Sequence, residues 1–117
     1  GLADIWRLRA GENLHRMPDI VVRPDTEEEV LAVLQAAKGE VPYAIVPVGG
    51  GTNVTSATNC PPQEVDARPF VALDMRGLCR VVWVNVEDRM ALVEVGITGS
   101  ALKDALSQKG VTMGMEP

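Results

Sequence analysis

The apolar positions in the first half of the chain form two short runs separated by a helical pattern. The first run, Pro18–Pro24, is bounded by prolines and predicts a strand. Thr26 and Glu29 then form a capping-box pair at the start of a helix, for which Gly39 supplies a stop. The helix has an apolar stripe formed by Val30, Val33, Leu34 and Ala37.

The second apolar run, Tyr43–Val48, predicts a buried strand. The order of strand, helix and strand predicts a βαβ unit, in which the two strands run parallel and the crossover is right-handed. We expect the helix to pack its apolar stripe against the resulting sheet.

The second half of the chain predicts three more strands and a second helix. A polar stretch from Ala57 to Pro69 precedes the strand candidates, and Thr98 caps a helix that ends at Lys109-Gly110. Trp83 lies inside an apolar strand, so we expect it in the core. A polar segment of hairpin length joins the last two strands into an antiparallel pair. The three strand candidates are Phe70–Asp74, Arg80–Val86 and Met90–Val95. The whole pattern predicts an α+β fold.

Composition and charge narrow the classes of function. A chain of 117 residues, 46% of them hydrophobic, is long enough for one domain with a real core. The formal charge of −5, with scattered basic residues, argues against nucleic acid as the main partner. No apolar run approaches the roughly 20 residues of a membrane helix. Cys60, Cys79 and the single histidine, His15, have no metal-ligand spacing, so we expect free thiols and no metal site.

A glycine-rich loop follows the second predicted strand and is the main candidate for chemistry. Three consecutive glycines can take positive φ angles and present backbone N–H groups to one anion, such as a phosphate or pyrophosphate. An ordinary tight turn is an equally good interpretation of the triplet alone. Its position at the carboxyl end of a strand favours the phosphate, because ligands of open α/β sheets collect there. The loop consists of Pro47, Val48, Gly49, Gly50, Gly51, Thr52, Asn53 and Val54; it matches neither the Rossmann nor the Walker pattern.

Together with this loop, several other motifs resemble the PCMH-type (vanillyl-alcohol oxidase-type) FAD-binding domain. Within that superfamily the chain is most similar to the alkyldihydroxyacetonephosphate synthase (alkylglycerone-phosphate synthase) family. The motifs that carry the resemblance are Asp4–Gly11, Arg16–Val21, Pro47–Thr52, Cys60-Pro61, Leu73-Asp74, Val82–Val84, Val93–Gly99 and Gly114–Pro117. The chain departs from the family at Asn53, where serine is usual, and at Met115, where histidine is common.

The resemblance implies FAD as the cofactor, with residues 1–17 leading into the domain and 18–117 forming its first part. It implies that Gly49, Gly50 and Gly51 donate backbone N–H groups to the FAD pyrophosphate. Side-chain hydrogen bonds from Thr52 and Asn53 would add to these, while Pro47 and Val48 aim the loop and Val54 packs against the cofactor. No catalytic residue is assigned, because the family's reactive groups and the second half of its flavin site belong to later segments, so we expect these 117 residues alone to be inactive.

The parent enzyme implied by the resemblance exchanges the acyl group of acyl-dihydroxyacetone phosphate for a long-chain alcohol in ether-lipid biosynthesis. A peroxisome or glycosome would be its compartment, and membrane association and a homodimer are compatible with it. Two alternatives stay open. One is a FAD-dependent 2-hydroxy-acid (D-lactate or glycolate) dehydrogenase or oxidase, and the other is a non-enzymatic module that binds a phosphate, a nucleotide or another protein.

Overall fold

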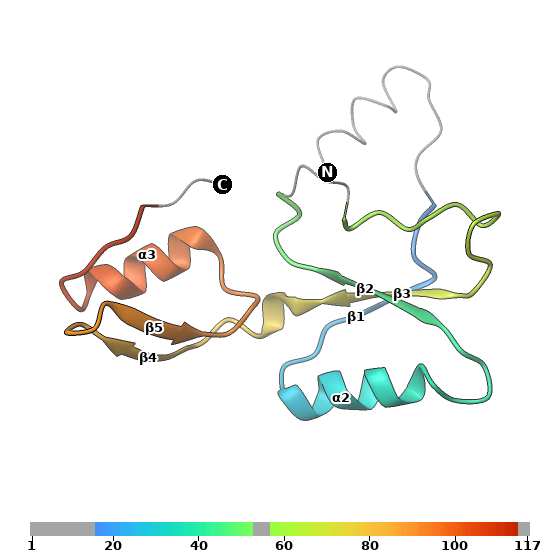
Figure 1. The fold of residues 1–117 in the computed structure, drawn as a ribbon, viewed down its shortest axis with the longest axis horizontal. Coiled ribbons are helices and arrows are strands. Elements are labelled where there is room, and N and C mark those ends of the chain that lie inside the picture. Colours follow the sequence, from blue (N-terminus) through green and yellow to red (C-terminus); the bar gives the residue numbers. More distant parts are fainter. Residues whose placement is uncertain (1–15, 53–56, 115–117) are drawn as a thin grey trace, which may run out of the picture.

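The structure is a computed structural model that describes residues 16–52 and 57–114, in which two small sheets each pair with a helix (Figure 1). The first lobe contains β1 (Ile20–Val22), α2 (Glu27–Ala36), β2 (Ala44–Val48) and β3 (Phe70–Asp74). The second lobe contains β4 (Val81–Asn85), β5 (Met90–Val93) and α3 (Gly99–Ser107). A short 3₁₀ helix, η1 (Met75–Gly77), follows β3 and connects the lobes. This element order confirms the predicted fold class.

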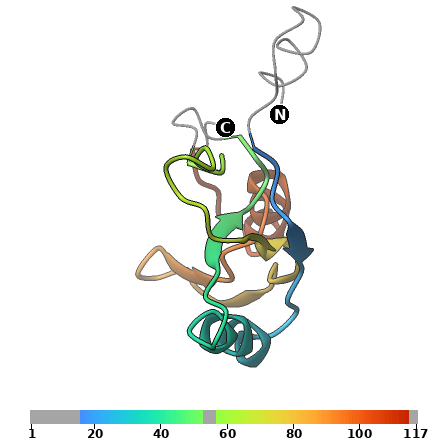
Figure 2. The same cartoon turned by 90° about the vertical axis from the view of Figure 1, so that its right-hand side faces the viewer.

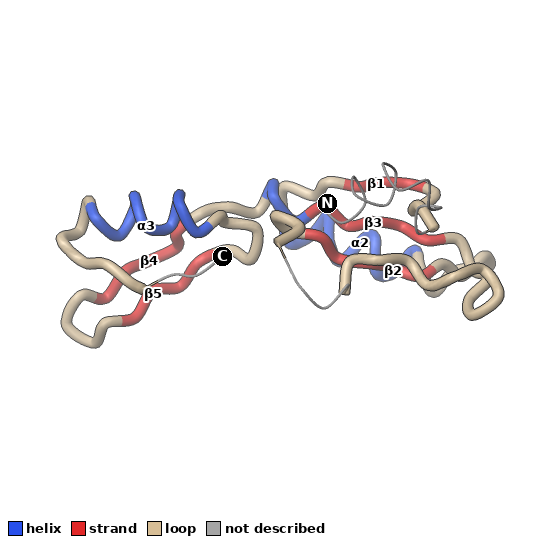
Figure 3. The backbone as a smooth tube through the Cα atoms, turned by 90° about the horizontal axis from the view of Figure 1, so that it is seen from above, coloured by secondary structure: helices blue, strands red, loops and turns tan. Residues whose placement is uncertain are grey.

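The sheet of the first lobe is parallel, and its strand order is β1-β3-β2 (Figure 3). The predicted βαβ order is confirmed, but β1 and β2 are not direct neighbours because β3 lies between them. Every residue of β3 is buried, whereas β1 and β2 each expose part of their length. The most buried strand is thus the central one, where a neighbouring strand covers each of its edges.

Local side-chain contacts fix the start of α2 as predicted. The Thr26 hydroxyl accepts a hydrogen bond from the Glu29 N–H at 3.2 Å. The Glu29 carboxylate accepts one from the Asp25 N–H at 3.0 Å, so the capping box reaches one residue before the cap. The helix ends at Ala36, earlier than the predicted stop at Gly39. The reason is that its last turn tightens, with the Gly39 N–H donating to the Ala36 carbonyl at 3.1 Å.

One face of the three-stranded sheet is covered by α2 (Figures 1 and 2). Val30 and Val33 are half-buried there, and the Tyr43 hydroxyl donates a hydrogen bond to the Val33 carbonyl at 2.7 Å. Leu34 stays 43% exposed, so the prediction that the whole apolar stripe packs on the sheet is wrong at this position. The described strands are too few to cover the full width of the helix.

The opposite face of the same sheet carries a small core under the loop of residues 57–69 (Figure 2). Cys60 from this loop packs with Val46 and Phe70, and burial raises the pKa of its thiol. The Arg16 guanidinium lies 4.7 Å from the centroid of the Phe70 ring and donates to the Arg68 carbonyl at 2.9 Å. The polar stretch of residues 57–69 thus covers one face of the sheet.

The second lobe contains the predicted antiparallel hairpin and the predicted second helix, α3, and the structure shows that the two pack together. The Thr98 hydroxyl caps α3 by accepting from the Ala101 N–H at 3.3 Å, and Leu106 is its buried residue. In the turn, Asn85 and Asp88 hydrogen-bond to each other through side chains at 3.0 Å. Trp83 is 44% exposed, so the prediction that it belongs to the core is wrong among the described residues. A two-stranded ribbon has two faces, and α3 can cover only one.

Two glycines make the junction between the lobes. A Cβ added at Gly77 would lie 2.5 Å from the Pro24 carbonyl oxygen, and one added at Gly96 would lie 1.7 Å from the Met75 carbonyl oxygen. The Gly96 N–H also donates to the Leu78 carbonyl at 2.7 Å. The backbone of η1 therefore packs against the segment at Pro24 and the segment at Gly96. Both contacts are too close for any residue with a Cβ at Gly77 or Gly96.

We expect Gly96→Ala to destabilise the fold strongly, because the new methyl group must displace backbone atoms rather than a flexible side chain. Overpacking costs about 1–3 kcal/mol, and more where backbone has to move. The thermal unfolding midpoint of the purified protein measures the effect. Gly114→Ala is the matched control, since its Cβ would meet no described atom within 4 Å. Equal midpoints for the two variants would show that the junction is not as tight as described.

Candidate functional site

The glycine loop leaves the sheet at the carboxyl end of β2, on the side of the first lobe that faces the second lobe (green in Figure 1). Gly49, Gly50, Gly51 and Thr52 are all exposed. Of the eight residues predicted to bind the cofactor, Asn53 and Val54 lie outside the described residues. The structure therefore places six of the predicted residues together at one edge of the sheet.

The space beside the loop is open. A Cβ added at Gly49, Gly50 or Gly51 would meet no described atom within 4 Å, in contrast to the filled surroundings of Gly77 and Gly96. Only Gly51 has a positive φ, at 73°, so the expected left-handed conformation is confined to one of the three glycines. Within residues 16–52 and 57–114, the backbone N–H groups of the triplet have no hydrogen-bond acceptor. Free donors beside open space are what an anion site requires.

The base of the loop is held by the edge strand. Val48 is half-buried against the core of Val46, Cys60 and Phe70, which fixes the direction in which the chain enters the loop. Pro47 is exposed and pairs in register with Leu73. A proline, which lacks an N–H, is tolerated here because β2 is an edge strand.

A buried carboxylate lies next to the loop. Asp74 is the register partner of Val48, and its two carboxylate oxygens accept from Nε and Nη2 of Arg76 at 2.9 and 2.7 Å. Asp74 also accepts from the Arg76 backbone N–H at 3.1 Å. These bonds, with a smaller contribution from Arg23, hold the pKa of Asp74 at about 2, below its ordinary value of 3.8. Asp74 is therefore ionised at neutral pH, and the guanidinium of Arg76 balances its negative charge.

The position of Asp74 beside the glycine loop cannot be predicted from local sequence. The carboxylate reaches the loop through strand pairing between β3 and β2, which come from distant parts of the chain. Glu94, the other carboxylate near a strand end, bonds to the Arg80 side chain, which lowers its pKa. Each of the two carboxylates thus forms an ion pair with its own arginine, and the two do not form an acid-base pair with each other.

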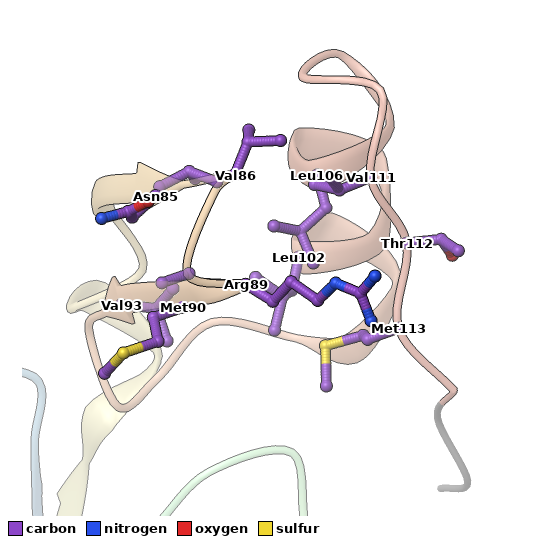
Figure 4. Close-up of a pocket in the computed structure, with 12 residues that line it drawn as sticks. Asn85, Val86, Arg89, Met90, Val93, Leu102, Leu106, Val111, Thr112 and Met113 are labelled. Carbon is purple, nitrogen blue, oxygen red and sulfur yellow. The ribbon is translucent and has the colours of Figure 1, made fainter.

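A second concave feature lies in the other lobe, between α3 and the hairpin (Figure 4). This cavity of about 740 Å³ contains none of the predicted cofactor residues. Its wall is mainly apolar, and the Arg89 side chain extends across it from the hairpin turn toward α3 and Met113. The apolar part of the lining is formed by Val84, Val86, Met90, Ala91, Val93, Leu102, Leu106, Val111 and Met113. It is an apolar face of the hairpin that α3 covers only in part, since Val86 and Met90 stay 50% and 60% exposed.

Comparison with known proteins identifies the family of the chain and the cofactor of that family. The sequence profile of the FAD-binding domain matches residues 18–117. The chain belongs to the FAD-binding domain family. FAD is therefore the cofactor of this domain, as the resemblance predicted. A glycine loop with free N–H donors fits the doubly charged diphosphate of that cofactor.

Individual proteins that are similar to the chain support this family assignment. Over 114 residues, or 97% of the chain, the FAD-binding domain is 38% identical to an alkyldihydroxyacetonephosphate synthase of Caenorhabditis elegans. A solved structure of alkyldihydroxyacetonephosphate synthase superposes on all of the chain with a TM-score of 0.82 at 35% identity, and the chain covers 21% of it. The mitochondrial D-lactate dehydrogenase [cytochrome] of Arabidopsis thaliana is 35% identical over 101 residues, or 86% of the chain.

The chain spans only about a fifth of the length of the curated relatives it matches, 18% of the worm synthase and 17% of the plant dehydrogenase. The comparisons therefore confirm the predicted resemblance and the cofactor over the matched length of the chain.

We expect Asp74→Asn to lower the thermal midpoint of the FAD-binding domain by a few degrees at neutral pH. The folded-state pKa of Asp74 is depressed, so its contribution to stability is present above its unfolded value near 3.8 and disappears as the pH falls through about 2. The difference in thermal midpoint between wild type and Asp74→Asn should thus disappear between about pH 4 and pH 2. Thermal unfolding across this range measures it.

The control is Asp104→Asn, which removes an exposed carboxylate that forms no ion pair among the described residues. A gap between wild type and Asp74→Asn that stays constant down to pH 2 would contradict the ionised Asp74–Arg76 pair.

Proposed function

We propose that this chain is the part of an alkyldihydroxyacetonephosphate synthase that binds the diphosphate of FAD through the loop from Pro47 to Val54. The observation that supports the proposal is the open, donor-rich glycine loop at the carboxyl end of β2, in a chain that belongs to the FAD-binding domain family. The names of the similar proteins supply the enzyme class.

Each loop residue has a role in this proposal. The backbone N–H groups of Gly49, Gly50 and Gly51 donate to the diphosphate oxygens, and the Thr52 hydroxyl adds a side-chain hydrogen bond. Pro47 and Val48 fix the direction of the loop from the sheet. Further contacts from Asn53 and Val54 stay predictions, because these residues lie outside the described part of the chain.

Bound FAD supplies the flavin ring that carries the chemistry of the exchange, in which a long-chain alcohol replaces the acyl group of acyl-dihydroxyacetone phosphate. The residues of this chain contribute binding and orientation. Asp74 and Glu94 are both neutralised by arginines, which leaves them poor general bases. We therefore assign the proton transfers and substrate contacts of the parent enzyme to segments outside this chain.

A second candidate is a FAD-dependent 2-hydroxy-acid dehydrogenase, which the similarity to the plant D-lactate dehydrogenase favours. The synthase is the better proposal because its relatives match more of the chain, 97% against 86%, and the C. elegans enzyme reaches higher identity. No observation favours the non-enzymatic alternative.

Location and assembly belong to the same proposal. We place the parent enzyme in a peroxisome or glycosome, associated with the membrane that holds its long-chain substrates and assembled as a homodimer. In the described ranges of the chain, no helix has both the length and the apolar character needed to cross a bilayer.

Gly50→Val in the full-length parent protein should remove bound flavin without unfolding the protein. The side chain enters space that no described atom occupies, so it blocks the diphosphate while leaving the packing intact. The visible absorption of the purified protein reports the flavin, and circular dichroism reports the fold. The Gly114→Val variant is a matched control. A folded Gly50→Val protein that retains full flavin content would rule out the loop as the diphosphate site.

Product analysis of the flavin-loaded parent protein distinguishes the two enzymes. We expect an alkyl product from acyl-dihydroxyacetone phosphate and a labelled long-chain alcohol, and no reduction of an electron acceptor by D-lactate or glycolate. The opposite result would make the dehydrogenase the correct assignment and leave the FAD site unchanged.

A further inference from the structure

The pair formed by Asp74 and Arg76 has no part in the loop contacts described above, yet it stands at the same edge of the sheet. Asp74 is the last residue of β3 and is paired in register with Val48, the residue before the glycine triplet. Side chains alternate along a strand, so Asp74 shares the face of Phe70 and Ala72, which is opposite to α2. The pair therefore lies beside the base of the loop.

The two members of the pair are exposed to very different extents. The Asp74 side chain is 12% exposed and the Arg76 side chain is 55% exposed, although Arg76 bonds the carboxylate with two nitrogens. A guanidinium carries five N–H donors, and Asp74 engages only Nε and Nη2. Among the described residues, Nη1 of Arg76 has no acceptor. The buried carboxylate thus holds an outward-facing cation in a fixed orientation.

The charge balance explains why such a cation belongs here. A diphosphate held by the loop would bring negative charge close to the ionised Asp74, and the two would repel each other. Arg76 neutralises Asp74 and still has donors in the planar arrangement that suits phosphate oxygens. Because Asp74 already holds the side chain, little conformational freedom remains to be lost when a phosphate binds.

We propose that Arg76 is an additional contact for the FAD diphosphate and that Asp74 is the positioning residue that aims it. This inference rests on the proposed function of the glycine loop. It adds the Arg76 side chain, which lies in η1 just after β3, to the backbone N–H donors that follow β2. The segments after two neighbouring strands would then bind the same diphosphate.

Titration of the flavin-free full-length protein with FAD, followed by flavin fluorescence, tests the inference. Arg76→Ala should raise the Kd for FAD roughly tenfold or more, the usual effect of losing a hydrogen bond to a charged group. Arg80→Ala is the matched control, because Arg80 also pairs with a carboxylate, Glu94, but lies in the second lobe. Its Kd should stay within about twofold of wild type.

Two further readouts separate binding from a purely structural role. Arg76→Lys keeps the charge without the planar fork, so it should bind FAD with an affinity between wild type and Arg76→Ala. The Kd of wild type should rise with salt more steeply than that of Arg76→Ala, because salt screens the extra charge. If Arg76→Ala does not fold, Arg76→Lys decides: weaker FAD binding supports the inference and unchanged affinity overturns it.

The two proposals fail in different ways. If Arg76→Ala and Arg80→Ala bind FAD equally well while Gly50→Val does not bind it, the inference about Arg76 is wrong and the loop assignment stands. If Gly50→Val binds FAD as wild type does, the loop assignment itself is wrong, and Arg76 loses the anion it was proposed to contact.

Discussion

The complete burial of β3 is the constraint on which the rest of the structure depends. All five of its residues are buried, and it pairs with β1 on one edge and β2 on the other. Because the three strands are parallel, their carboxyl ends meet at one edge of the sheet. The glycine loop, Asp74 and the start of η1 therefore arrive together, although they come from separate segments of the chain.

Two sets of glycines in the described part of the chain differ in what surrounds them. A Cβ added at Gly77 or Gly96 would lie less than 3 Å from protein backbone, so these two glycines are required by the close packing at the junction between the lobes. Gly49, Gly50 and Gly51 face open space and keep their N–H groups free among the described residues. The absence of a Cβ has the same steric consequence in both groups, but the close neighbour is protein in one and, in our proposal, the cofactor in the other.

Sequence patterns predicted the elements well because their signals are local. The Thr26 cap, the hairpin and the helix after Thr98 each depend on residues a few positions apart, and each is confirmed. The insertion of β3 between β1 and β2 was not predicted, because strand order depends on long-range pairing that no local pattern encodes. The exposure of Leu34 and Trp83 was missed for a related reason, since an apolar pattern does not say how much neighbouring chain is available to cover it.

Only the part of the site that depends on local sequence was predicted. A glycine triplet is visible in sequence, and the resemblance to a flavin-binding family gave it a ligand. The Asp74–Arg76 pair became a candidate only when strand register placed it beside Val48.

The most direct test of the central claim is an experimental structure of the full-length parent protein with FAD bound. Our account predicts diphosphate oxygens within hydrogen-bond distance, about 3 Å, of the backbone nitrogens of Gly49, Gly50 and Gly51. A diphosphate bound elsewhere in the protein, with the triplet facing solvent, would contradict it.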